Sequence, residues 1–293
     1  MIVMFPHHDA VAAEAPIPLG ASGNFAVLAG STVTSTGATT VAGDLGVWAG
    51  SEVTGFAGIP PGGPGTVNGT IHAGDAAAQA AQGDLTTAYN DAAGRTLAPV
   101  DVANADLGGR TLVPGLYKSS GTLAITGNLT LDAQGDTNAV FIFQATSSLD
   151  TAAGSQVILS GNANAANIYW QIGSSATLGT TTIFKGNILA NQSISLATGA
   201  TLDGRALARI GAVTLDANAI AIPNLAITPV MLVSAAKVTD LYADAPGNSV
   251  DLATKTITVP MSGGAQYYRI SSATALTITT ISVSGGNVVI EYK

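Results

Sequence analysis

The sequence contains no cysteine, few aromatic residues and few charges. The absence of cysteine excludes a disulfide framework and any thiolate metal site. Charged residues make up 10% of the chain, against roughly 25% in an ordinary soluble domain. Disorder does not explain the low charge because 47% of residues are hydrophobic, and a membrane span does not because no run of about 20 apolar residues occurs. These absences indicate a globular protein whose surface carries Thr, Ser, Asn and Gly in place of ions.

Positive charge is also scarce. The 10 basic residues are outnumbered by 18 acidic ones, giving a net charge of −8. Nucleic-acid binding selects clustered Lys and Arg, and no basic patch is visible, so we expect no nucleic-acid partner. Arg205 and Arg209 lie close in the sequence, where a small cationic spot is possible but a structural or solvated role fits better.

Catalytic signatures are missing as well. There is no GxSxG, HExxH or P-loop motif, and His72 has no evident metal-ligating partner. The adjacent His7 and His8 point to opposite sides of an extended chain. We therefore predict a protein that is not an enzyme, with no catalytic residue, metal site or cofactor. The acidic residues are dispersed, mostly at expected turns where Asp bonds the backbone: Asp132, Asp136, Asp150, Asp203 and Asp216.

Residues 1–18 read either as the remainder of a targeting segment or as a disordered tail. Ala10–Ala13 resembles the small-residue region before a signal cleavage site, although an apolar core segment is missing. We expect a secreted or extracellular protein with no membrane span, and attachment to a cell surface is an option.

Repetition dominates the chain after Gly115. Four similar segments begin at Phe141, Ile168, Ile188 and Ala206, and each contains three short strands separated by turns. A period of roughly 18–27 residues is typical of solenoids, and three strands per coil give a triangular cross-section. Alternation places Ile194, Leu196 and Leu202 inside.

One helix is predicted over residues 75–94, with Asp75 as its N-cap and Gly94 at its end. Its stripe of small residues requires close packing against another surface. The near-continuous apolar runs 140–143 and 168–170 are typical of strands covered on both sides, so we expect the helix to cover them. Residues 48–72 are rich in Gly and Pro and are predicted to form a loop.

Residues 230–293 lose the coil period and gain charge and tyrosine. Strand-like alternation continues there, and residues 284–287 (SGGN) predict a hairpin turn. We expect a small, separate β-rich module.

Several ordered blocks resemble the DUF3494 family of microbial ice-binding proteins. They are LGASGNFAVLAGSTVTSTGATTVAGDLGV, GTVNGTIHAGD, LVPGLYKSSGTLAITGNLTLD, and AVFIFQ followed by NIYWQIGSSATLG. The resemblance covers residues 19–224. It implies a mainly β fold: a discontinuous right-handed parallel β-solenoid with the helix alongside, N-terminal strands that complete coils formed later in the chain, and loop 48–72 as a cap. It also implies an antifreeze function, with an ice crystal surface as the partner.

The resemblance also implies an ice-contacting pattern, Thr-Ala/Gly-x-Thr/Asn. Residues 36–39 and 198–201 match it, and the other coils match it only in part. Each threonine could equally serve surface packing. The predicted ice-contacting residues are Thr36, Thr39, Thr151, Thr180, Thr182, Thr198, Thr201, Thr214 and Asn218.

Two other functions remain open at this stage. A surface adhesin or structural solenoid could assemble or attach to cells through residues 230–293, because an open β module can pair with another chain. A polysaccharide-active enzyme is the weaker alternative, since the clustered carboxylates that it needs are not visible.

Overall fold

The computed structural model describes residues 14–60, 62–102 and 106–223, together with the strands of the C-terminal part. The chain divides into two compact units, Met1–Leu225 and Ala226–Lys293, and each is described by itself.

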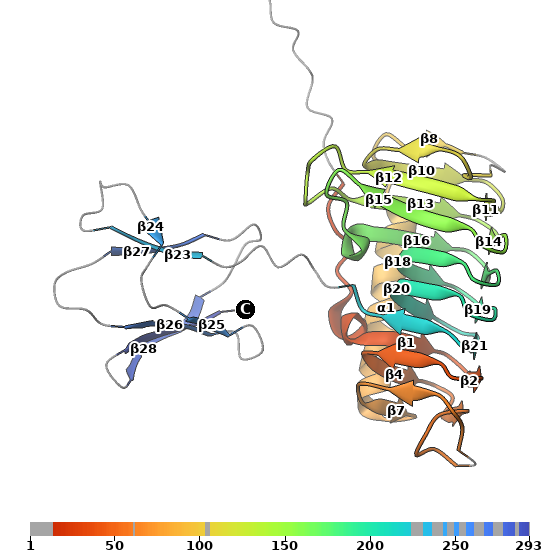
Figure 1. Ribbon diagram of the computed structural model, residues 1–293, viewed down its shortest axis with the longest axis horizontal. Coiled ribbons are helices and arrows are strands. Elements are labelled where there is room, and N and C mark those ends of the chain that lie inside the picture. Colours follow the sequence, from red (N-terminus) through yellow and green to blue (C-terminus); the bar gives the residue numbers. More distant parts are fainter. Residues whose placement is uncertain are drawn as a thin grey trace, which may run out of the picture. The chain divides into compact units, whose positions relative to one another are not determined.

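The first unit is a parallel β-solenoid with three strands per coil (Figure 1). One face is a separate seven-stranded sheet. The other two faces belong to one 15-stranded sheet, because the long strands β18 and β20 bend from one face into the next. After the helix, successive coils contain β8 (Val100–Asp101) and β9 (Thr111–Leu112); β10 (Gly115–Ser119), β11 (Leu123–Ile125) and β12 (Asn128–Asp132); β13 (Phe141–Ala145), β14 (Leu149–Thr151) and β15 (Gln156–Ser160); β16 (Ile168–Ile172), β17 (Ala176–Leu178) and β18 (Ile183–Ala190); β19 (Ile194–Leu196) and β20 (Thr201–Ala208); β21 (Val213–Asp216) and β22 (Ala219–Ala221).

The strand register confirms the predicted period. Gly115 pairs with Phe141, 26 positions on, and Phe141 pairs with Ile168, 27 positions on. Later coils are shorter, since Asn187 pairs with Arg205, 18 positions on. The coils therefore differ in length while their strands remain parallel and aligned.

The stack of coils is discontinuous in sequence, as the resemblance implied. The N-terminal strands do not begin the stack but continue it beyond the last coil: β1 pairs with β20, β2 with β21 and β3 with β22. Figure 1 shows β1 and β2 beside β20 and β21, and β4 beyond β1. These coils comprise β1 (Phe25–Ala29), β2 (Thr32–Thr36) and β3 (Thr40–Ala42); β4 (Asp44–Val47), β5 (Glu52–Thr54) and β6 (Thr66–Val67); and β7 (Ile71–Ala73).

Helix α1 (Ala76–Gly94) lies along the solenoid, as predicted (Figure 1). The Asp75 side chain accepts a hydrogen bond from the Ala78 amide and so caps its first turn. The buried stripe contains Ala78, Ala81, Leu85, Ala88 and Ala92. The helix covers β13 and β16, which explains why every residue of these two strands is buried.

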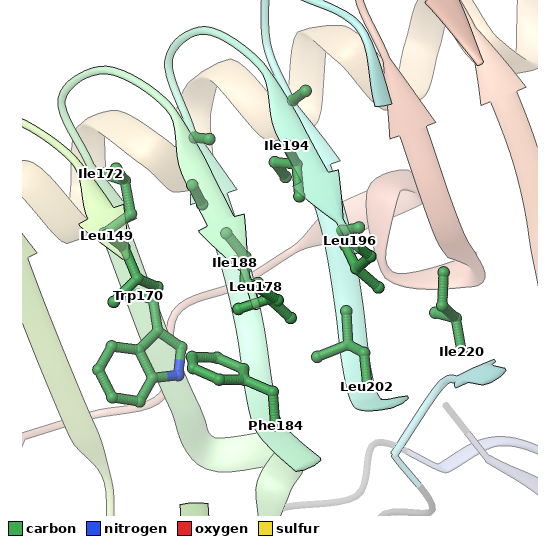
Figure 2. Close-up of a cluster of buried hydrophobic side chains, with 14 of the residues drawn as sticks. Leu149, Trp170, Ile172, Leu178, Phe184, Ile188, Ile194, Leu196, Leu202 and Ile220 are labelled. Atoms are coloured by element: carbon green, nitrogen blue, oxygen red, sulfur yellow. The ribbon is translucent and has the colours of Figure 1, made fainter. Parts of the chain in front are cut away.

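The interior of the solenoid is a continuous apolar column (Figure 2). Ile194, Leu196 and Leu202 point inward, as predicted. Tyr117, Phe143 and Trp170 stack in neighbouring coils, with ring centroids 5.2 and 4.0 Å apart. Toward β19 and β22 the column is aliphatic.

Two boundaries differ from the sequence prediction. Residues 48–72 are not a simple loop, because β5, β6 and most of an additional coil form within them; the buried Phe56 closes the apolar column there. The packed chain also begins before residue 19. Glu14 and Ile17 are buried against the helix side of the solenoid, and Glu14 pairs with Arg95 at 3.1 Å. The prediction for residues 1–13 lies outside the described residues.

The second unit contains antiparallel strands. The pairing of Ser284 with Asn287 confirms the predicted hairpin. One sheet contains three strands and the other four. They are β23 (Met231–Ala235), β24 (Ala243–Asp244) and β27 (Tyr267–Ser271), then β25 (Ser249–Asp251), β26 (Thr256–Pro260), β28 (Ile278–Ser284) and β29 (Asn287–Tyr292).

Candidate functional site

The seven-stranded sheet carries an uncharged field of small side chains. Inward residues alternate with outward ones on each strand, as in any sheet with one buried side. We call the outward residues of five adjacent strands, β17, β19, β21, β2 and β5, the threonine face. Its central row is Thr177, Ser195, Thr214, Thr34 and Thr54, and its leading row is Ser175, Ser193, Ala212 and Thr32.

The central row is straight because the backbone fixes its register. Thr177 pairs with Ser195, Ser195 with Thr214, Thr214 with Thr34, and Thr34 with Thr54. Paired residues on hydrogen-bonded strands repeat at about 4.7–4.9 Å. The row therefore presents five hydroxyls at a nearly constant spacing.

The two rows differ in how their hydroxyls are used. In the leading row, Ser175 Oγ accepts a hydrogen bond from the Ser193 amide at 3.3 Å, and Ser193 Oγ accepts one from the Ala212 amide at 3.2 Å. These contacts tie each coil to the next. In the central row, within the part of the chain that the structure describes, no hydroxyl has a protein hydrogen-bond partner. The central row is thus free to bond an external lattice.

Charges mark the limits of this face. Asp150 occupies the central row one strand beyond Thr177, and Glu52 stands on β5 at the opposite end. Ile210 is 57% exposed at the edge where β20 turns into β21. The central row is itself uncharged over five strands, whereas Glu52 on β5 and Asp216 on β21 lie in the rows beside it.

The other two faces are less suitable for flat contact. One is covered by helix α1. The third face, formed by β9, β12, β15, the first part of β18 and of β20, β22, β3 and β6, carries an ion pair between Lys185 and Asp203 at 3.1 Å. Ile158 and Ile183 also protrude from it. Among the described residues, the leading and central rows of the threonine face form an open stretch without charge from β17 to β2.

Comparison with known proteins places this geometry in a family. The Ice-binding-like family model matches residues 27–221. The chain belongs to the Ice-binding-like family. It is 50% identical over 220 residues to an ice-binding protein of Nostoc sp. (strain HG1), covering 74% of this chain and 78% of that protein. It is 37% identical over 221 residues to one of Flavobacterium frigoris (strain PS1), covering 71% and 77%. The crystal structure of an ice-binding protein from an Antarctic biological consortium matches with a TM-score of 0.68 and 51% identity, covering 75% of this chain and 96% of that one.

These relatives of the Ice-binding-like family are named as ice-binding proteins and not as enzymes. In the described part of the chain, no group of three or more His, Cys, Asp or Glu side chains is placed to hold a metal ion. No helix among the same residues is long and apolar enough to cross a membrane.

The nine predicted contact residues lie at different places in the structure. Thr214 lies in the central row of the threonine face. Thr36, Thr180 and Thr198 are exposed at the corner between this face and the third face, where the Thr198 hydroxyl donates to the Asp216 carboxylate. Thr201 points outward on the third face. Five of the nine are therefore accessible, but they do not share one plane.

The other four are buried, so their side chains offer little surface for a contact with ice. Thr151 and Thr182 bond each other at 2.9 Å inside the corner. The Thr39 hydroxyl accepts a hydrogen bond from the Asn218 amide at 3.2 Å. The Asn218 side chain donates to the carbonyls of Ala197 and Ala200. These four residues hold the corner from within: Thr39, Thr151, Thr182 and Asn218.

The Thr-Gly pattern in this chain coincides with turns. Gly37 and Gly199 have φ angles of +72° and +71°, which side-chain-bearing residues adopt only at a cost. Strand alternation was the better guide to the exposed surface. Leu149 points inward and therefore Thr151 does too, while Thr34, Thr54, Thr177 and Ser195 alternate with buried neighbours and point outward.

Proposed function

We propose that the protein adsorbs to ice through the threonine face and thereby inhibits ice growth or recrystallisation. The observation that carries the proposal is the straight central row of five hydroxyls without protein partners and without a charged side chain among them. The family membership and the names of the relatives support the same function.

Rigidity and chemistry both suit this surface to ice. Each threonine hydroxyl donates and accepts hydrogen bonds, and its β-branched side chain is stiff, so little rotamer entropy is lost on adsorption. A single hydrogen bond contributes only about 0.5–1.5 kcal/mol net. Several acting together on one rigid plate hold the molecule at the crystal surface, because all of them must break before it leaves.

Adsorption at separated points explains the inhibition. Ice between two bound molecules must grow as a curved front, and curvature raises the free energy of the solid. Growth then slows or stops without any covalent chemistry. No cofactor takes part in this mechanism.

The decisive experiment replaces two adjacent members of the central row. Thr34→Tyr with Thr214→Tyr inserts bulky rings across the middle of the threonine face, and we expect most of the thermal hysteresis to disappear. The matched control is Thr111→Tyr with Thr130→Tyr, since these two threonines are register neighbours on the third face. Circular dichroism melting checks that both variants fold. Equal activity of the two doubles would show that the wrong face has been chosen.

We further propose that the protein works outside the cell, where ice forms, and that residues 226–293 attach it to a surface or to another copy. The small-residue stretch Ala10–Ala13 and the separate antiparallel unit support these proposals. Fractionation of the producing cells tests the location. Ice-affinity purification and light scattering of the chain with and without residues 226–293 test the second unit: ice partition should persist without it, whereas multimers or surface retention should be lost.

A further inference from the structure

The threonine face is assembled from two separate parts of the chain. Thr177, Ser195 and Thr214 follow the helix, whereas Thr34 and Thr54 precede it. The junction lies between β20–β22 on one side and β1–β3 on the other. Any slip at this junction would break the central row between Thr214 and Thr34.

Backbone pairing is thin at one point of the junction. On the helix-covered face, β1 meets β20 through only two register pairs, Val27 with Ala206 and Leu28 with Leu207. By contrast, β18 meets β20 on the same face through four, from Asn187 with Arg205 to Ala190 with Ala208. The start of β1 therefore depends on contacts other than the strand ladder.

Arg205 supplies such a contact. Its Nε donates to the Gly23 carbonyl at 2.9 Å, just before β1 begins, and its Nη1 donates to Asn187 Oδ1 at 2.8 Å. The Asn187 amide in turn donates to the carbonyls of Ala166 and Ile168, at 3.0 and 3.1 Å. A chain of side-chain hydrogen bonds thus crosses four successive coils and the junction.

The position of Arg205 costs free energy, because its charged side chain is removed from water. Its side chain is buried, with 8% exposure, and among the described residues no carboxylate forms an ion pair with it. Burial lowers the pKa of Arg205 to about 10, so it still carries its charge near neutral pH. A buried charge without a counter-ion is retained only where its hydrogen bonds matter.

We propose that Arg205 is a positioning residue for the threonine face: by fixing Gly23 and the start of β1, it keeps the N-terminal coils in register with the C-terminal coils. This inference rests on the proposed function for its activity consequence but not for its structural one. Arg205 itself never touches ice.

The test compares Arg205→Gln with Arg209→Gln. Arg209 directly follows the same strand, which ends at Ala208, but its guanidinium bonds Asn191 and lies over the Tyr89 ring without crossing the junction. We expect Arg205→Gln to speed amide hydrogen exchange in β1 by at least about tenfold, since bonds to charged groups are among the stronger ones, and to lower thermal hysteresis per folded molecule. Arg209→Gln should leave β1 exchange near that of the parent.

A disulfide across the junction separates positioning from general stability. The chain has no cysteine, so Val27→Cys with Ala206→Cys forms a single defined cross-link between register partners. In the Arg205→Gln background it should restore both β1 protection and hysteresis. If Arg205→Gln does not fold, Arg205→Lys, which retains the charge but not the fork of donors, takes its place in the same comparison.

Unchanged β1 exchange in the Arg205 variant, or activity that stays low after cross-linking, overturns the inference. The proposed function fails separately, through a parent protein without hysteresis or a threonine-face double that keeps it. In that case the hydrogen-exchange comparison still decides the role of Arg205.

Discussion

The solenoid contains two kinds of coil, and they differ most at a single corner. Where the third face meets the helix-covered face, the coils at β12 and β15 use long loops, residues 133–140 and 161–167. The coils at β18 and β20 turn the same corner within one strand, at Gly186 and Gly204. A Cβ atom on Gly204 would lie 1.9 Å from the Gly186 carbonyl oxygen, so glycine is required for this tight turn.

The two kinds of coil also differ on the outside. The short coils carry Thr177, Ser195 and Thr214 in the central row, whereas the long ones place Ala124 and Asp150 there. From β10 to β20, length variation is thus kept on the side of the molecule away from the threonine face, and a long loop next to that face occurs at its end, in residues 55–65 between β5 and β6. A protein surface that binds a regular crystal lattice must itself be regular. A corner that turns at a single glycine leaves no room for an additional residue.

An insertion tests the difference between the two kinds of coil most directly. One glycine added between Gly204 and Arg205 would reverse the inward and outward alternation of the following strand, and we expect a loss of at least about 4 kcal/mol in unfolding free energy. One glycine added after Gly135, in the long loop, should cost less than about 1 kcal/mol. Urea denaturation measures both. Similar losses would mean that the tight corner does not set the register.

The interior offers the second test. Phe143→Ala removes the middle ring of the Tyr117–Phe143–Trp170 stack, and we expect it to cost about 3–5 kcal/mol because a large cavity opens. Ile188→Ala, in the aliphatic part of the same column and in register with Trp170, should cost less. A larger loss for Ile188→Ala in thermal unfolding would contradict the view that the aromatic stack contributes more to stability than the aliphatic part of the column.

A substitution in the central row provides the third test. Asp150→Thr extends the uncharged central row by one coil, adding a hydroxyl worth about 0.5–1.5 kcal/mol of adsorption. The concentration needed to inhibit ice recrystallisation should fall. Asp136→Thr is the matched control, because it removes the same charge from an exposed loop. If both substitutions lower the concentration equally, net charge and not the row is responsible.

The smallest effect concerns a turn. Ala217 has a φ of +52° at the corner where Gly37 and Gly199 occupy the equivalent turn. Ala217→Gly should relieve left-handed strain and stabilise the fold by about 0.5–1 kcal/mol, raising the melting temperature by a few degrees. A lower melting temperature would show that the strain at this position is negligible.

Much of the fold could be predicted from the sequence because its signals are local and repeated. The helix with its Asp75 cap, the coil period and the inward Ile194, Leu196 and Leu202 all follow from spacing. The order of the coils does not, since the pairing of Val27 with Ala206 leaves no local trace; it came from the family resemblance. The candidate site was only partly predicted. The Thr-Gly pattern drew attention to Thr39 and Thr182, whose hydroxyls serve the corner, and away from Thr34 and Thr177, which alternation alone would have placed outside.

The discontinuous stack also constrains how the protein is made. Residues 25–54 leave the ribosome long before residues 201–221, yet these are the strands on which they must stack. In a solenoid whose coils stack in sequence order, each coil can be added as it is synthesised. Here the N-terminal coils are synthesised first but can stack only after the last coils have been synthesised. Contacts so far apart in sequence slow folding, and completion of the fold is therefore tied to the release of nearly the whole solenoid.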